Sequence, residues 1–136
     1  SKRAGIELAT TLDHNNLKHV LVFSDGLNVN GTDLVDGMSQ ALPKGVTVTG
    51  GLAGDGPNFK KTYIINRTDL LGEGQIKAIG LYGDNIKVGF GSRGGWDSFG
   101  VDRTVTKSKG NVLYEIDGEP ALDLYKSFLG DKVFNY

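Results

Sequence analysis

The sequence contains no cysteine, only three prolines and a single tryptophan. The chain therefore has no thiol group, which excludes disulfides, thiolate catalysis and cysteine-bound metals. Its 15 basic and 16 acidic residues nearly cancel to a net charge of -1, and no basic stripe suggests a nucleic-acid partner. No apolar run approaches the roughly 20 residues of a membrane span, and no stretch has the pattern of a signal peptide. We therefore expect neither a nucleic acid nor a membrane as a partner, and a cytoplasmic location.

Glycine, by contrast, is abundant, with 21 residues in a chain of 136. The glycines gather in a few short segments, which is unlike their distribution in a flexible linker. Glycine lets the backbone approach another group closely, so such clusters indicate loops whose backbone lies against a ligand or another part of the chain. Because the chain starts at Ser1 and ends without a terminator pattern, we expect it to be a piece of a longer protein, forming one partial domain over residues 1–136.

Hydrophobic periodicity predicts short helices and a run of strands. Helices are expected over 3–12, 32–42 and 120–129, the second with Thr32 as its N-cap. Strands are expected over 18–23, 46–48, 62–66, 75–82, 86–90, 102–108 and 111–116. Hairpin links dominate after residue 56, so the order predicts an α+β fold with a mixed, mostly antiparallel sheet and a few flanking helices.

The segment Gly89–Gly94 matches the glycine pattern of dinucleotide-binding proteins, G-x-G-x-x-G. That site also needs a helix whose N-terminus faces the pyrophosphate. Here residues 96–100 lead into a strand, so the match does not predict a dinucleotide site. No spacing of His, Asp and Glu resembles a metal site, and we expect neither a cofactor nor a metal.

Two aspartates, Asp25 and Asp55, each stand at a strand end beside glycine. Paired carboxylates can perform acid/base chemistry, but aspartates in such places usually bond their own turns. We favour the second interpretation. The two histidines, His14 and His19, are interpreted as polar surface residues.

Two glycine-rich segments are the candidate binding elements. Residues 50–56 (GGLAGDG) form either a tight turn or a nest of backbone N–H groups that faces an anion. Residues 92–100 (SRGGWDSFG) combine Arg93, which suits a carboxylate, with Trp96, whose indole can cover an apolar group. Alternatively, Trp96 and Phe99 close the end of the sheet. These alternatives stay open on the sequence alone.

Three long segments together resemble the N-terminal half of the FIST domain family. They are 23–42 (FSDGLNVNGTDLVDGMSQAL), 43–62 (PKGVTVTGGLAGDGPNF and its continuation) and 80–130, which includes GLYGD and VGFGSRGGWDSFG. The resemblance implies a bacterial sensory domain that binds small molecules, amino acids among them, and acts on a signalling output domain or protein. It further implies that residues 1–136 are the C-terminal portion of a FIST N domain, with 119–136 as the start of the following FIST C domain.

On this basis we expect ligand binding without catalysis. The expected ligand-binding residues are Asp25, Asn30, Gly50, Gly51, Gly54, Asp55, Ser92, Arg93 and Trp96. In this hypothesis Arg93 and the backbone N–H groups of 50–54 hold a carboxylate, Asp25 or Asp55 holds an ammonium, and Trp96 covers the side chain. Two alternatives are a hydrolase or transferase with Asp25 or Asp55 as general base, and an interaction or dimerisation module.

Overall fold

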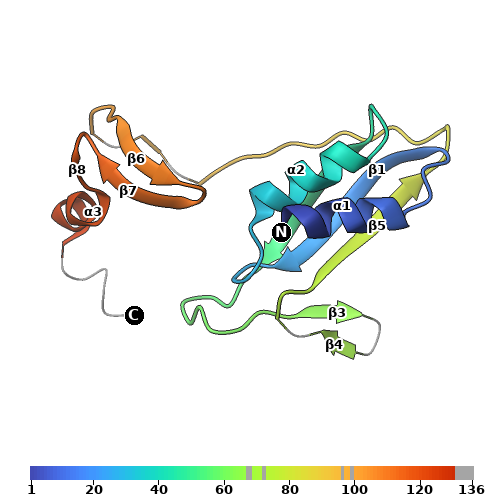
Figure 1. The fold of residues 1–136 in the computed structure, drawn as a ribbon, viewed down its shortest axis with the longest axis horizontal. Coiled ribbons are helices and arrows are strands. Elements are labelled where there is room, and N and C mark those ends of the chain that lie inside the picture. The colour runs from blue at the N-terminus through green and yellow to red at the C-terminus, as the bar shows by residue number, and fades with distance from the viewer. Residues whose placement is uncertain (67–68, 72, 96, 99, 131–136) are drawn as a thin grey trace. The chain divides into compact units, whose positions relative to one another are not determined.

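A computed structural model (Figure 1) describes residues 1–66, 69–71, 73–95, 97–98 and 100–130. The chain divides into two compact units, Ser1–Gly91 and Ser92–Tyr136. In the described part, no helix is both long and apolar enough to cross a membrane. Two compact units can belong to one sequence domain, so the single partial domain over 1–136 stays a prediction.

The sheet of the first unit is built around a central strand, β1 (Leu17–Asp25). On one side β2 (Thr47–Ala53) runs parallel to it, and on the other β5 (Ile76–Tyr82) runs antiparallel. A parallel pair needs a crossover connection, which α2 (Gly31–Ala41) supplies. Both parallel strands therefore end at the same edge of the sheet, where Asp25 pairs with Ala53.

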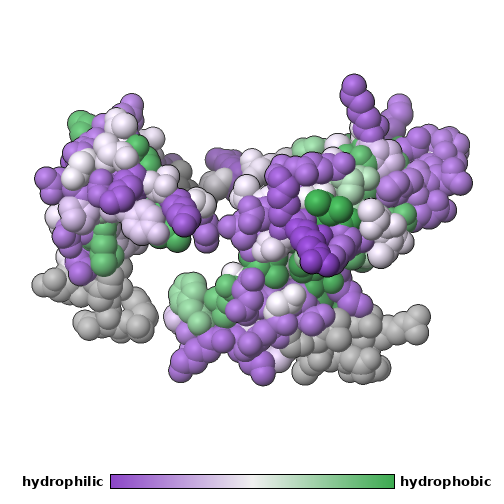
Figure 2. Space-filling view, in the orientation of Figure 1, coloured by the Kyte–Doolittle hydropathy of each residue, from purple (hydrophilic) through white to green (hydrophobic). Residues whose placement is uncertain are grey.

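One face of this sheet is covered by α1 (Lys2–Thr11) and α2, which lie side by side (Figure 1). The surface over these helices is largely hydrophilic (Figure 2), and their inner faces bury the core with β1: Ala9, Leu17, Val20, Val22, Leu34, Met38 and Leu42. A Cβ on Gly37 of α2 would overlap the carbonyl oxygen of Lys2 in α1. The helices can come this close because Gly37 has no side chain.

The opposite face of the sheet carries no helix of the first unit within the described residues. Apolar side chains on it stay in contact with solvent, with Phe23 44% and Ile79 52% exposed. Between β2 and β5 the chain forms a hairpin of β3 (Ile64–Asn66) and β4 (Asp69–Leu71). Its strand β3 contacts β1. The first unit therefore has one filled face and one open apolar face.

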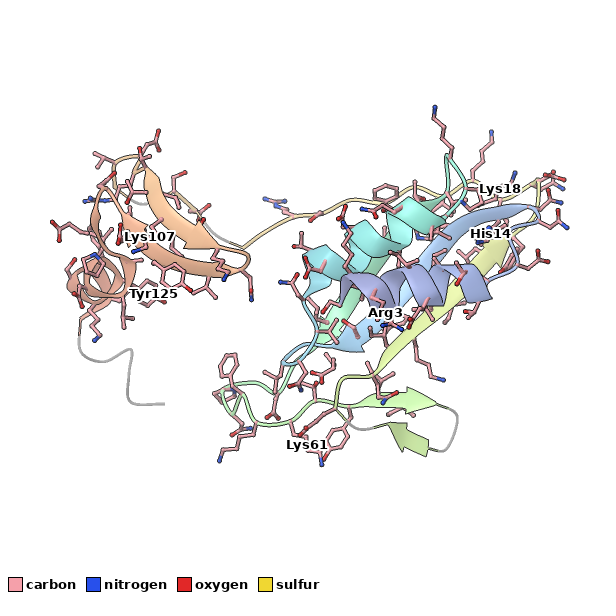
Figure 3. All side chains as sticks on the ribbon, viewed as in Figure 1. Arg3, His14, Lys18, Lys61, Lys107 and Tyr125 are labelled. Carbon is pink, nitrogen blue, oxygen red and sulfur yellow. The ribbon has the colours of Figure 1, made fainter. Side chains whose placement is uncertain are left out.

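The second unit contains a hairpin of β6 (Val105–Lys109) and β7 (Val112–Ile116), followed by β8 (Glu119–Pro120) and α3 (Ala121–Leu129). Asp117, in the turn after β7, accepts hydrogen bonds from the backbone of Thr104 and from Arg103. Among the described residues of this unit, only Ala121 is buried. Figure 3 labels Lys107 and Tyr125 on its hairpin and helix.

The α+β class with a mixed, largely antiparallel sheet arrangement is confirmed. Three local predictions are wrong. The N-cap of α2 is Asn30, whose side chain accepts a hydrogen bond from the backbone of Asp33, and not Thr32. The second strand does not end at residue 48 but continues to Ala53. Residues 86–90 do not form a strand.

Candidate functional site

Asp25 is fully buried at the edge where β1 and β2 end. Its Oδ1 accepts hydrogen bonds from the backbone N–H groups of Leu27 (2.7 Å) and Asn28 (3.3 Å) and from the Thr62 hydroxyl (2.6 Å). Its Oδ2 accepts from the Asn28 side-chain amide (2.8 Å) and the backbone N–H of Gly74 (2.5 Å). The carboxylate thus holds together the turn after β1, the segment before β3 and the turn before β5.

These donors keep the Asp25 carboxyl ionised. The Thr62 hydroxyl and then the Gly74 N–H hold its pKa far below the usual range, against an opposing effect of burial. The pKa of Asp55 is also lowered, chiefly by the backbone N–H groups of Lys61 and Lys60, which donate to its Oδ2 at 3.0 and 2.9 Å. A general base that works near neutral pH needs a raised pKa. Neither carboxylate meets that requirement. Both accept hydrogen bonds from their own turns, which is the interpretation that the sequence favoured.

Acid should weaken the fold through Asp25. In the unfolded chain its pKa returns to about 3.9, above the folded value. The unfolded state then binds the proton more readily, so this contribution to stability is present above about pH 5 and is lost as pH falls. At pH 6 the wild type should have a higher free energy of unfolding than Asp25→Asn. At pH 3 this difference should be smaller by about 1 kcal/mol. Urea unfolding at several pH values measures this, and a constant difference would contradict it.

The other predicted residues of the first unit have varied surroundings. Asn30 caps α2, so its side-chain oxygen already has a partner. Gly50 and Gly51 are strand residues of β2, in register with Val22 and Phe23, which corrects their interpretation as loop. Gly54 follows the strand and has open space around its Cα.

Ser92 and Arg93 belong to the second unit, where both are exposed. Trp96 lies outside the described residues, as does Phe99. The participation of Ser92, Arg93 and Trp96 in a ligand site stays a prediction.

A hollow of about 500 Å³ opens on the free face of the sheet. It is lined by side chains and backbone from β1, β2, β5 and the segment of the β3 hairpin: Phe23, Gly51, Leu52, Ala53, Tyr63, Ile64, Ile65, Lys77 and Ile79. Its volume and mainly apolar lining are in the range typical of small-molecule sites. Because Asp25 lies two residues after Phe23 on the same strand, its carboxylate cluster stands on the same face, next to the hollow.

The sequence interpretation placed only Gly51 of this lining in the site. One signal could have indicated the rest. Residues 18–23 (KHVLVF), in β1, carry apolar side chains on both faces of the strand, which predicts that other elements pack on both sides. The helices α1 and α2 cover only one side. The alternation of Lys77 and Ile79 against Ile76 and Ala78 likewise marked a second, partly apolar face of β5.

His19 is buried, not a surface residue as predicted. Its ring nitrogens bond the hydroxyls of Thr47 (2.6 Å) and Thr49 (2.8 Å) on β2, and its ring stacks on Phe90 with centroids 6.1 Å apart. The imidazole therefore joins β1 to β2. His14 is exposed, as predicted, and is labelled in Figure 3. No group of three or more His, Asp and Glu side chains in the described part could hold a metal ion.

Comparison with known proteins places the chain in a family. An uncharacterised protein, MJ1623, of Methanocaldococcus jannaschii is 26% identical over 110 residues, which are 81% of this chain and 21% of that protein. The chain thus spans about a fifth of the length of this relative. No solved structure matches it significantly. The sequence model of the FIST N domain matches residues 1–119, and the chain therefore belongs to the FIST family.

Proposed function

We propose that this chain is a small-molecule-sensing module that binds its ligand without catalysis, and that the hollow on the free face of the sheet is where the ligand binds. The FIST family is associated with sensing in signal transduction. The observation that carries the proposal is an apolar hollow of about 500 Å³ with Phe23, Tyr63 and Ile79 about half exposed around it. A ligand that covers such side chains removes apolar surface from water and gains about 25 cal/mol per Å².

Binding becomes sensing when the ligand prefers one of two states of the protein. The hollow is suited to this, because its walls come from segments far apart in the chain. Phe23 lies near the end of β1, Gly51 on β2, Tyr63 before β3 and Ile79 on β5. A ligand in contact with all of them would favour the arrangement in which they stand together. A signalling output domain or protein would read this change, and a cytoplasmic location fits that role; both stay predictions.

The two rival functions have weaker support. A hydrolase or transferase with Asp25 or Asp55 as general base would need a raised pKa, and both pKa values are lowered. An interaction or dimerisation module would present an exposed apolar patch without a concavity, whereas the free face is hollowed. The concavity therefore favours a ligand.

We expect a thermal-shift screen of amino acids and other small metabolites to find compounds that raise the midpoint of unfolding. A ligand that binds only the folded state at 100 times its Kd adds about 2.7 kcal/mol of stability. In Ile79→Ser, this shift should be lost, because the side chain lines the hollow, while the unliganded midpoint changes little because Ile79 is 52% exposed.

The matched control is Leu27→Ser, an apolar residue that is 38% exposed and does not line the hollow. It should retain the full shift. If Ile79→Ser responds to every compound as the wild type does, ligands do not bind in the hollow. Arg93→Ala in the same assay tests the prediction from the sequence: a lost shift supports a role for the guanidinium, and an unchanged one removes Arg93 from the site.

A further inference from the structure

The described lining of the hollow carries only positive charge. Among the described lining residues, Lys77 is the only charged side chain. It is half-buried and stands directly across from Phe23 in the pairing of β1 with β5, so both lie on the free face. Lys77 makes no ion pair with any described residue. A partly buried ammonium without a counterion next to apolar walls attracts an anion more strongly than one in open water.

A second cation lies close to the same lining. The Lys61 ammonium stands 5.2 Å from the centroid of the Tyr63 ring, a cation–π contact. Figure 3 labels Lys61 on the segment that leads to β3. It too has no ion-pair partner in the described part. Two lysines near an apolar hollow thus provide positive charge, and neither forms an ion pair with a described carboxylate.

The nearby carboxylates already accept hydrogen bonds from the protein. Both oxygens of Asp25 accept hydrogen bonds, five in all, and no part of the side chain is exposed. Asp55 holds the backbone of Lys60 and Lys61. An ammonium group on a ligand would lose water in the hollow, and the described lining offers it no carboxylate, which is costly. The hollow therefore disfavours a zwitterionic amino acid, although its apolar walls suit an amino-acid side chain.

We propose that the hollow binds an apolar carboxylate, an aryl or alkyl chain that ends in a single anionic group and carries no ammonium. The chain packs on Phe23, Tyr63 and Ile79, and Lys77 holds the carboxylate. This inference rests on the proposed function, since it names the ligand class for the same site.

Three probes that differ in one group each can test it by calorimetry: 3-phenylpropanoate, 3-phenylpropanamide and phenylalanine. The first should bind about three- to tenfold more tightly than the other two, since a partly buried charge pair is stronger than an exposed one. Lys77→Met keeps the apolar stem and removes the charge. It should reduce the affinity for 3-phenylpropanoate by the same factor and leave that for the amide unchanged, whereas Lys87→Met, an exposed lysine away from the lining, should alter neither.

The results separate this inference from the proposed function. Phenylalanine binding as tightly as 3-phenylpropanoate, with no effect of Lys77→Met, would overturn the anion preference and leave a ligand site in place. The same holds if none of the three probes binds while the metabolite screen finds a ligand sensitive to Ile79→Ser. If the screen finds no such ligand either, both proposals fail. Tighter carboxylate binding that weakens with added salt and with Lys77→Met supports the inference.

Discussion

Asp25→Ala should lower the free energy of unfolding by about 3 to 5 kcal/mol, the cost typical of breaking a buried, hydrogen-bonded charge network. The substitution leaves five donors from the turn after β1, from Thr62 and from Gly74 without their acceptor. Stability of small domains is about 5 to 15 kcal/mol, so much of it depends on this one carboxylate. Urea unfolding monitored by circular dichroism measures the loss.

A suitable control is Asp84→Ala. Asp84 is an exposed aspartate whose ion pair with Lys18 spans 3.4 Å, and such pairs contribute at most about 1 kcal/mol. The two substitutions remove the same group, so the difference between them reports what burial and hydrogen bonding add. Equal stability of the two variants would mean that Asp25 does not hold the three segments together.

Gly50→Ala should destabilise the protein by about 2 kcal/mol or more, while Gly51→Ala, its neighbour in β2, should be neutral or slightly stabilising. A Cβ at Gly50 would overlap the carbonyl oxygen of Val22 in β1, a backbone atom that cannot move without separating the strands. At Gly51 no atom lies within 4 Å of the added methyl group. There the loss of unfolded-chain freedom favours alanine by about 0.4–1 kcal/mol.

Since both substitutions are the same and the positions are adjacent, strand propensity cancels in the comparison. Denaturant unfolding of both variants gives the two values side by side. A cost at Gly51 as large as at Gly50 would show that the glycines are needed for backbone conformation and not for the close approach of β1 to β2.

Local chemistry accounts for what could be predicted from the sequence. The periodicity of α1 and α2, the apolar run of β1 and the alternation in β5 each follow from which side chains must face the core, and all four elements are present. The N-cap of α2 was misplaced because Asn30 and Thr32 are both good capping residues. Only the geometry, with Asn30 accepting from Asp33, distinguishes them.

The features that were missed depend on contacts distant in the sequence. His19 is buried because Thr47 and Thr49 of β2 offer hydroxyls to both ring nitrogens. Glycines 50 and 51 looked like a loop, since glycine is rare in strands. They are strand because β1 approaches closely at Gly50. The hollow itself is formed by residues that are scattered from Phe23 to Ile79, and no short motif connects them.

The central claim is that a small molecule binds on the free face of the sheet, and an NMR titration of the labelled protein tests it most directly. The probe is the compound that stabilises the protein most in the thermal screen. We predict that chemical shifts change first and most at Phe23, Gly51, Leu52, Tyr63 and Ile79, with the helices α1 and α2 little affected. Changes confined to residues outside this lining, with none at Phe23 or Ile79, would contradict the claim.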